Sequence, residues 1–292
     1  MTGFSVQARD LTVRFGDTVA LDGVTFELSA GGIYGLLGRN GSGKTTLLSV
    51  LAALRAPTSG EVLVDGEDPF ENARVMAGTG IVRESGDVMG AERVSTNLRY
   101  FAAMRPSWDG ERAAGLVDAF GIDPRKRVQA LSRGQRSALG AVIGLATRAP
   151  LTVFDEVYLG MDAPSRQLFY DELLADVVTH PRTVILSSHL IGEIEHLLER
   201  VVILDRGRVL LADETDVLRA KGVTLTGPGA VVDAVTAGMR VIGARDLGPT
   251  RQVTVFDALD DDELAGARRA GLDLGPVPLQ DLFIHLTAQE SR

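Results

Sequence analysis

Residues 38–46, GRNGSGKTT, are the stretch of this chain that indicates its fold most strongly. It follows the apolar run GIYGLL at residues 32–37 and precedes the helical pattern TTLLSVLAAL at residues 45–54. A pattern G-x-x-x-x-G-K-[ST] between a strand and a helix is typical of a P-loop, whose backbone N–H groups surround phosphate oxygens at the start of the helix. The sequence therefore predicts a site for a purine nucleoside triphosphate. A glycine-rich turn that binds nothing is the alternative interpretation.

The same loop supplies side chains for the phosphates and their metal ion. We expect Lys44 to span the β- and γ-phosphates and the Thr45 hydroxyl to hold Mg²⁺. The sequence thus predicts a purine nucleoside triphosphate with Mg²⁺ as its companion ion. The other residues of the expected cradle are Gly38, Asn40, Gly41, Ser42, Gly43 and Thr46.

Two carboxylates end a second apolar stretch, LTVFDE at residues 151–156. Because ligands of parallel sheets bind at the carboxyl ends of the strands, Asp155 is placed to contact Mg²⁺ and Glu156 to polarise the attacking water as a base. His189 follows the run TVILSS at residues 183–188, so we expect it at the same edge, where it can hydrogen-bond the γ-phosphate and orient Glu156 or the water. Alone, a strand ending in two acids is more often the start of a solvated loop, and a single histidine is usually an ordinary polar residue.

Composition limits the class of protein. The chain has 292 residues, of which 45% are apolar and 24% charged, an ordinary globular composition for one large domain or two modest ones. Its net charge of -9 argues against a nucleic-acid partner, which needs a basic surface. The absence of cysteine excludes disulfides, thiolate metal sites and cysteine nucleophiles. No secretion signal is recognisable and the apolar runs are shorter than the roughly 20 residues that span a bilayer, so we expect a cytoplasmic protein.

The order of strand and helix patterns predicts an α/β fold. Alternating runs near the start predict an antiparallel edge sheet, and later apolar runs separated by helical stretches predict a parallel sheet covered on both faces. The alternating runs are LTVRF at 11–15, VTFEL at 24–28 and EVLVD at 61–65. The later apolar runs are 151–155, 183–188 and 201–205.

Two further regions interrupt or follow this core. From about residue 85 to 148 the patterns are helical, which predicts a helical insertion within a nucleotide-binding domain of residues 1–221. After Gly222 the sequence becomes rich in small residues, and we expect a small α+β domain at 222–292. Its expected elements are strands at VTL, 223–225, and RQVTVF, 251–256, a helix at about 260–270 and a last helix after Pro278.

The motifs occur in the order found in the nucleotide-binding subunits of ABC transporters, and over about residues 4–220 the chain resembles that family. Besides the P-loop and the acidic strand, the resemblance rests on the signature LSRGQ at 131–135 and on the GMD turn at 160–162. It implies a P-loop core of the ABC ATPase type and hydrolysis of ATP with Mg²⁺.

The resemblance also implies a role for residues outside the P-loop. Phe15, where the family more often has tyrosine, is expected to stack on adenine. Ser132 and Gly134 are expected to bind a γ-phosphate, helped by the positive end of the helix that begins near Gln135. Asp162 is expected to communicate across a dimer.

A second phosphate cradle at 131–135 raises the question of which anion it holds. If the helical insertion is a separate lobe, this loop cannot readily fold back onto the P-loop of its own chain. A second subunit docked head to tail, identical or paralogous, would supply it, so that two ATP molecules lie between two chains and the dimer opens after hydrolysis. The alternative, compatible with this one, is a plain helix N-cap at Ser132.

Three positions depart from the family pattern. Where the family usually has a glutamine after the strand GIV, the nearest equivalent is Glu84, which can contact Mg²⁺ but cannot donate a hydrogen bond unless protonated. Coupling between the helical insertion and a partner is the step that this change affects. Val157 replaces the usual proline and Met161 the usual leucine, and both changes preserve the backbone geometry that matters there.

The C-terminal stretch PLQDLFIHLT, residues 278–287, resembles the end of ATPase subunits from exporters whose permease is a separate chain. This resemblance implies a transmembrane permease as partner and a peripheral position on the inner face of the cell membrane. We expect permease contact near Leu98, Tyr100 and Phe101, although a core role is the simpler expectation for at least two of them. The C-terminal domain is expected to be either regulatory or purely structural.

Two other classes of function remain open. One is a soluble ABC-type ATPase that drives an assembly or regulatory process, and the other is a regulatory module that does not hydrolyse ATP. The complete set of Lys44, Asp155, Glu156 and His189 argues against the second class.

Overall fold

The computed structural model describes residues 3–83, 87–256 and 259–289. These residues form two compact units. The first lies within Met1–His189 and Leu204–Val209, and the second within Leu190–Ile203 and Leu210–Arg292. All the predicted site residues that are described belong to the first unit.

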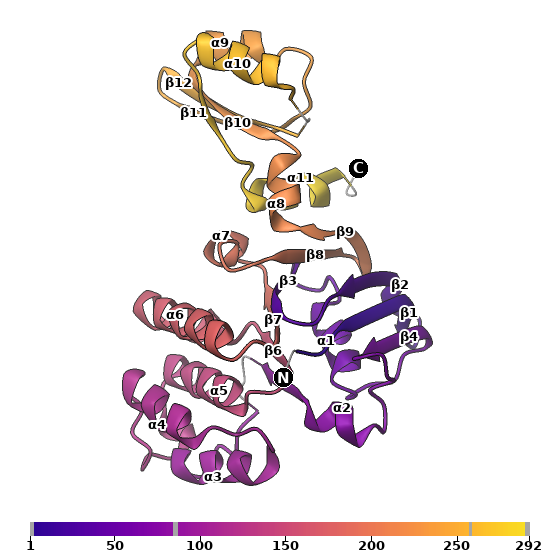
Figure 1. The fold of residues 1–292 in the computed structure, drawn as a ribbon, viewed down its shortest axis with the longest axis vertical. Helices are drawn as coiled ribbons and strands as arrows, with labels where there is room; N and C mark the ends of the chain where they lie inside the picture. The colour runs from indigo at the N-terminus through magenta and orange to yellow at the C-terminus, as the bar shows by residue number, and fades with distance from the viewer. Residues whose placement is uncertain (1–2, 84–86, 257–258, 290–292) are drawn as a thin grey trace. The chain divides into compact units, whose positions relative to one another are not determined.

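The first unit begins with an antiparallel sheet of three strands (Figure 1). The strands are β1 (Val6–Phe15), β2 (Thr18–Leu28) and β4 (Ser59–Val64), in the order β2-β1-β4. In β2 alternate residues are buried, among them Val24, Phe26 and Leu28, as expected for a strand with one solvated face. The predicted antiparallel edge is therefore confirmed.

A parallel sheet forms the centre of the first unit. Its strands there are, in spatial order, β5 (Thr79–Arg83), β6 (Leu151–Asp155), β7 (Thr183–Ser188) and β3 (Gly32–Gly38). Every residue of β6 and β7 is buried, polar ones such as Thr152 and Ser187 included, as expected for parallel strands covered on both faces. Because the strands are parallel, Gly38, Asp155 and Ser188 end their strands at one edge of the sheet, which we call the carboxyl edge.

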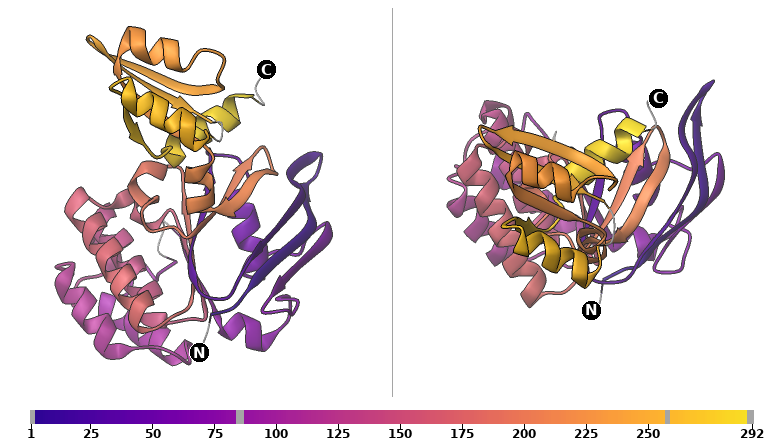
Figure 2. Two further views of the ribbon diagram at one scale, coloured as in Figure 1. Left: turned by 45° about the horizontal axis from the view of Figure 1, so that its top comes forward. Right: turned by 90° about the horizontal axis from the view of Figure 1, so that it is seen from above.

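Helices pack on this sheet. The helical insertion comprises α3 (Val94–Met104), α4 (Gly110–Ala119), the 3₁₀ turn η1 (Val128–Ala130) and α5 (Arg133–Thr147), and among residues 87–148 no strand occurs. The other helices of the unit are α1 (Lys44–Leu51), α2 (Ala73–Ala77), the 3₁₀ turn η2 (Val157–Gly160) and α6 (Ala163–Thr179). Figures 1 and 2 show α3 to α6 on one side of the parallel strands and β1, β2 and β4 on the other. The predicted helical insertion is confirmed.

Aromatic packing fixes the strand that carries the acidic pair. The Phe154 ring packs edge-on against Phe169 of α6, with 5.1 Å between ring centroids. A Cβ on Gly144 of α5 would collide with the Phe154 ring, so glycine is needed where α5 crosses β6. Phe154 precedes Asp155, so this packing holds the end of β6 in place.

The second unit contains a four-stranded antiparallel sheet, with strands in the order β11-β12-β10-β13. Its elements along the chain are β10 (Val223–Pro228), α9 (Gly229–Val235), β11 (Val241–Leu247), β12 (Thr250–Val255), α10 (Asp261–Arg269) and β13 (Asp273–Gly275). This order of elements and strands is the split β-α-β arrangement of ferredoxin-like folds. Val232 of α9 and Ala267 of α10 pack with Leu225 and Val253 in its core.

The remaining elements are α7 (Ile191–Ile194), β8 (Arg200–Asp205), β9 (Arg208–Glu214), α8 (Thr215–Ala220) and α11 (Leu279–Gln289). The predicted strands at 223–225 and 251–256 and the two predicted helices are present as β10, β12, α10 and α11, which confirms a small α+β fold. α9, β11 and β13 were not predicted. The predicted border at Gly222 falls between α8 and β10, whereas the second compact unit also includes residues of α7, β8 and β9, so the border stays a prediction.

Candidate nucleotide site

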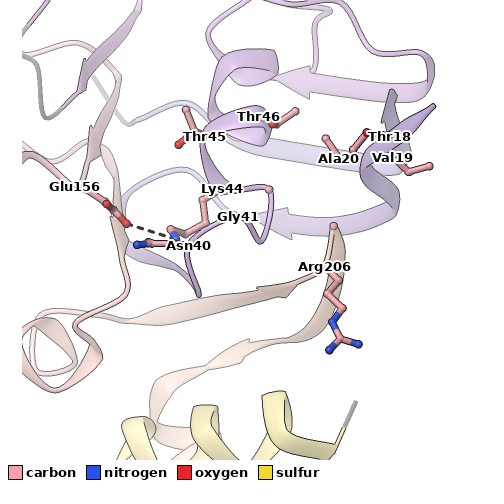
Figure 3. Close-up of a pocket in the computed structure, with 12 residues that line it drawn as sticks. Thr18, Val19, Ala20, Asn40, Gly41, Lys44, Thr45, Thr46, Glu156 and Arg206 are labelled. Atoms are coloured by element: carbon pink, nitrogen blue, oxygen red, sulfur yellow. Dashed lines mark ion pairs between the residues drawn. The ribbon is translucent and has the colours of Figure 1, made fainter. Parts of the chain in front are cut away.

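The loop between β3 and α1 carries Asn40 and Gly41 and is followed by Lys44 (Figure 3). Its last residue before α1 must be glycine. Gly43 caps α1 with φ of 106°, and a Cβ there would lie 2.7 Å from the carbonyl oxygen of Ala20. The Ser42 N–H donates to the carbonyl oxygen of Arg39 at 3.1 Å, and the Ser42 carbonyl accepts from the Gly207 N–H at 2.9 Å. The loop is thus fixed by its own backbone and by that of neighbouring segments.

Lys44 is the first residue of α1 and is only 5% exposed. Its ammonium donates to the carbonyl oxygens of Gly38 at 2.7 Å and Arg39 at 3.2 Å, and its Nζ lies 3.5 Å from Oε1 of Glu156 (Figure 3). A buried ammonium needs such partners because it has lost its water. Phosphate oxygens that enter the cavity would compete with Glu156 for this cation.

Glu156 directly follows β6 and has a backbone φ of 53°, in the left-handed region that non-glycine residues seldom occupy. Such backbone strain is concentrated at functional sites. Nδ1 of His189 lies 3.1 Å from Oε1 of Glu156. With Glu156 ionised, Nδ1 carries the hydrogen and donates to the carboxylate. The structure therefore brings together the predicted base, the predicted orienting histidine and the P-loop lysine.

Thr45 and Asp155, the two predicted Mg²⁺ contacts that are described, are also neighbours. The Thr45 hydroxyl donates to Oδ2 of Asp155 at 3.2 Å. Asp155 is buried, and this burial raises the pKa of its carboxyl above the ordinary value. Its Oδ1 has no hydrogen-bond partner among the described residues, and neither has the buried Oγ of Ser42. Such unpaired buried oxygens fit a hard cation, so the residues present are compatible with Mg²⁺.

The protein does not surround such an ion by itself. Among the described residues, no group of three or more His, Asp or Glu side chains could hold a metal ion. Mg²⁺ usually keeps water ligands and binds through one or two carboxylates together with substrate phosphates. A Thr–Asp pair beside a phosphate loop agrees with that mode of binding.

These groups lie around a cavity of about 580 Å³. The predicted residues that line it are Asn40, Gly41, Gly43, Lys44, Thr45, Thr46 and Glu156. The cavity is also lined by Thr18, Val19 and Ala20 from β2 and by Arg206 and Gly207 from the turn between β8 and β9, none of which was predicted (Figure 3). Their place depends on strand pairing between distant segments, which no local motif reveals.

Other predicted residues lie outside this lining. Phe15 pairs with Thr18 at the start of β2, so it is adjacent to the lining, but its ring is 45% exposed and the Arg55 guanidinium lies 4.1 Å from its centroid. Asp162 caps α6 by accepting from the N–H of Ser165 at 3.0 Å, and hydrogen bonding to the Ser165 side chain and then to its backbone lowers the pKa of Asp162. Gly38 and Ser42 shape the loop without lining the cavity. Glu84 lies outside the described residues.

The signature segment forms the start of α5. The Ser132 Oγ accepts from the Gln135 N–H at 3.1 Å, and the Gln135 side chain accepts from the Ser132 N–H at 3.3 Å, which is a capping box. A Cβ on Gly134 would lie 3.0 Å from the carbonyl oxygen of Gly160, so this glycine allows a close approach. The helix-cap interpretation of Ser132 is therefore confirmed. Ser132, Gly134 and Gln135 do not line the cavity of their own chain.

Three features together define a nucleotide-binding protein with the features of an ATPase. They are a P-loop at the end of the central strand β3, an acidic pair at the end of β6, and a histidine beside that pair; β7 lies between the two strands. The ABC transporter family model matches residues 21–158. The daunorubicin resistance ATP-binding protein DrrA3 of Streptomyces coeruleorubidus is 30% identical, and the similarity covers 96% of this chain and 94% of that protein. The chain belongs to the ABC transporter family, as one of its ATP-binding proteins. ATPase domains of this family generally bind and hydrolyse ATP.

Two further similarities accompany this assignment. The probable multidrug ABC transporter ATP-binding protein YbhF of Escherichia coli K12 is 28% identical over 78% of this chain, which spans only 40% of the length of YbhF. A solved structure described as the ATP-binding subunit of an ABC transporter has a TM-score of 0.68 at 21% identity and covers 73% of this chain and 91% of that one. This likeness shows the same fold. In the described part of the chain, no helix is both long and apolar enough to cross a membrane.

Proposed function

We propose that this chain is the ATP-hydrolysing subunit of an exporter whose membrane permease is a separate polypeptide. The observation that carries the proposal is the contact of Glu156, at the cavity, with both Lys44 and His189, beside the Thr45–Asp155 pair. Export is supported by similarity along nearly the whole chain to DrrA3, a protein named for daunorubicin resistance. Through the permease, the chain would lie on the inner face of the membrane.

Each side chain has a distinct task in this proposal. Lys44 exchanges Glu156 for the β- and γ-phosphate oxygens, which frees the carboxylate to accept a proton from the attacking water. His189 keeps that carboxylate oriented through its Nδ1–H. Thr45 and Asp155 would hold Mg²⁺, which neutralises phosphate charge when bound. Phe15 would contact the adenine from the edge of the cavity.

A second ATPase subunit, identical or paralogous, completes the site. The phosphate loop lines the cavity, whereas Ser132, Gly134 and Gln135 of the same chain do not. The N-terminus of α5, a helix of 15 residues, carries a partial positive charge. We propose that this end of the partner subunit closes over the γ-phosphate and that Asp162 transmits the closure between subunits. Loss of the γ-phosphate removes the contact and opens the dimer.

The permease would meet the helical insertion at α3. Of the three residues expected at this contact, Tyr100 is 49% exposed, whereas Leu98 and Phe101 are half-buried. Leu98 and Phe101 therefore contribute mainly to packing within the insertion, and Tyr100 is the residue available to a partner. Met104, one turn further along α3, is also exposed.

The Glu156→Gln variant tests the proposed function. With its base removed, the protein should bind MgATP without turnover and shift from monomer to dimer in light scattering, while steady-state phosphate release falls about 10²- to 10⁴-fold. MgADP should leave it monomeric, because the γ-phosphate is the shared ligand. The double variant Lys44→Ala, Glu156→Gln is the matched control and should stay monomeric in MgATP. Wild-type turnover in the Glu156→Gln variant, or a monomer under saturating MgATP, would refute the proposal.

A further inference from the structure

The opposite end of the parallel strands, which we call the amino edge, carries charged side chains that the nucleotide site does not use. Arg148 follows α5, His180 follows α6 and Arg182 directly precedes β7. Because β6 has five residues and β7 has six, this edge lies about 15–20 Å from Asp155 and His189. It is therefore a separate place on the same unit.

A cavity of about 280 Å³ opens at this edge. Its wall consists of Arg148, His180 and Arg182, the hydroxyl residues Ser107 and Thr179, and two prolines. No carboxylate is among these lining residues. Every ionisable group at the wall is therefore a cation or becomes one on protonation, and each hydroxyl can donate a hydrogen bond.

The carboxylates of the region pair with these arginines but are not among the residues that line the cavity. Oδ2 of Asp176 lies 2.5 Å from Arg182, and Arg148 lies 3.5 Å from Oδ1 of Asp176 and 2.9 Å from Asp109. Arg182 is only 3% exposed, yet its Nε and that of Arg148 have no hydrogen-bond partner among the described residues. Burial lowers the pKa of Arg182, whereas the charge and hydrogen bond of Asp176 oppose this shift. Counting the Arg112–Glu172 pair, three guanidiniums face three carboxylates among the described residues of this edge, so a protonated His180 would carry the one positive charge without a carboxylate of its own.

The tautomer of His180 in this arrangement follows from its hydrogen-bond partners. NH1 of Arg148 lies 3.0 Å from Nε2 of His180, and because a guanidinium only donates, Nε2 must carry a lone pair. The Nδ1 side faces the Thr179 hydroxyl at 2.9 Å and Oδ1 of Asp176 at 3.7 Å. Protonation of Nε2 would set two cations against each other. An anion between them would remove this repulsion.

We propose that this cavity binds a tetrahedral phosphate-type dianion, held by Arg148, Arg182 and the protonated form of His180. Two guanidiniums and an imidazolium supply charge-assisted donors, and planar guanidiniums match the oxygens of phosphate. The cavity has room for the anion and its remaining waters. The ligand is either free phosphate or the phosphoryl group of a small compound.

The test uses sulfate as probe, because sulfate stays a dianion from pH 6 to 8. The chain has four histidines, so ring signals in an NMR correlation spectrum can be assigned with the His180→Gln variant. The measurement is made on Lys44→Ala protein, so that phosphate binding at the P-loop does not interfere. We expect the His180 signals to shift with a saturating dependence on sulfate, the pKa of His180 to rise in sulfate, and binding to be tighter at pH 6 than at pH 8.

Matched variants separate a built site from general screening by salt. Arg148→Gln should weaken sulfate binding about tenfold, because a charge-assisted contact is lost. Ser107→Ala, which keeps all charges, should weaken it about threefold. Arg125→Gln, which removes an exposed charge elsewhere in the helical insertion, should leave it unchanged.

A shift that rises linearly without saturation, or equal titrations of the Arg125→Gln, Ser107→Ala and Arg148→Gln proteins, would overturn the proposal. Comparison of inorganic phosphate with phenyl phosphate then identifies the source of the anion. Tighter binding of the ester points to a small phosphorylated compound, and equal or weaker binding of the ester points to free phosphate.

Discussion

The two ends of the parallel strands carry similar chemistry in opposite arrangements. At the carboxyl edge one ammonium, Lys44, faces the carboxylate of Glu156, whose side chain is 20% exposed beside an open cavity. At the amino edge one carboxylate, Asp176, lies among the guanidiniums of Arg112, Arg148 and Arg182, and its side chain is 2% exposed. The Lys44–Glu156 pair can therefore exchange partners, whereas the Arg182–Asp176 pair is part of the core.

Exposure decides this because water and ligands can replace a partner only where they can reach it. Glu156 and His189 are close enough to solvent to let a nucleotide take Lys44 away from the carboxylate. Asp176 has no such replacement, and loss of one partner leaves the other buried and charged. Substitutions at three positions test this contrast, with progressively smaller expected effects.

Asp176→Ala should have the largest effect, and on stability. Removal of this carboxylate leaves the buried Arg182 without the oxygen that lies 2.5 Å away, and breaking a buried pair costs about 3–5 kcal/mol. Urea unfolding monitored by circular dichroism measures the free energy of unfolding. Asp171→Ala, an exposed position on the same helix, is the control and should change it by less than about 0.5 kcal/mol. Equal losses in the two variants would show that the cluster at the amino edge adds no stability.

His189→Gln should come next, and on activity. Loss of the imidazole removes the Nδ1–H that holds Glu156, and we expect the rate of phosphate release to fall about 10²-fold. The free energy of unfolding should change by less than about 1 kcal/mol, because the imidazole is partly exposed. His180→Gln at the amino edge is the matched control and should keep the wild-type rate. A normal rate in His189→Gln would remove the histidine from the proposed mechanism.

The carboxyl edge was predictable from sequence because each of its groups adjoins a strand end that can be recognised locally. Lys44 and Thr45 follow β3 within one motif, and Asp155 and Glu156 end an apolar run. Asn40, Lys44 and Glu156 line one cavity because β3 and β6 end at the same edge of a parallel sheet. This is why the nucleotide site could be anticipated in most of its members.

The remaining features depend on contacts between distant segments. Arg206 and Thr18 reach the cavity because the turn between β8 and β9 and the start of β2 are brought beside the P-loop. Asp176 lies in α6, where an acidic side chain is normally solvated, and only the fold shows it to be buried. In the second unit β11 has mostly exposed or half-buried residues and β13 is three residues long, so neither gave a periodic signal. Their pairing with β12 and β10 completes the sheet.

Ser132 gives the smallest expected change in stability and separates two roles of one side chain. Ser132→Ala removes the hydroxyl that caps α5 and should cost about 1 kcal/mol of unfolding free energy. Ser132→Asp keeps a capping oxygen, so its stability should match the wild type within about 0.5 kcal/mol. In the Glu156→Gln background, however, its negative charge would oppose the γ-phosphate of the partner site and prevent the MgATP-dependent dimer.

Light scattering in MgATP measures dimer formation by the Glu156→Gln protein with and without the Ser132→Asp substitution. A stable protein that no longer dimerises shows that Ser132 meets phosphate in the closed state. A stable protein that dimerises normally reduces Ser132 to a helix cap. The carboxyl edge would then have to complete its site without the signature segment of a second subunit, which would leave the γ-phosphate with donors from one chain alone.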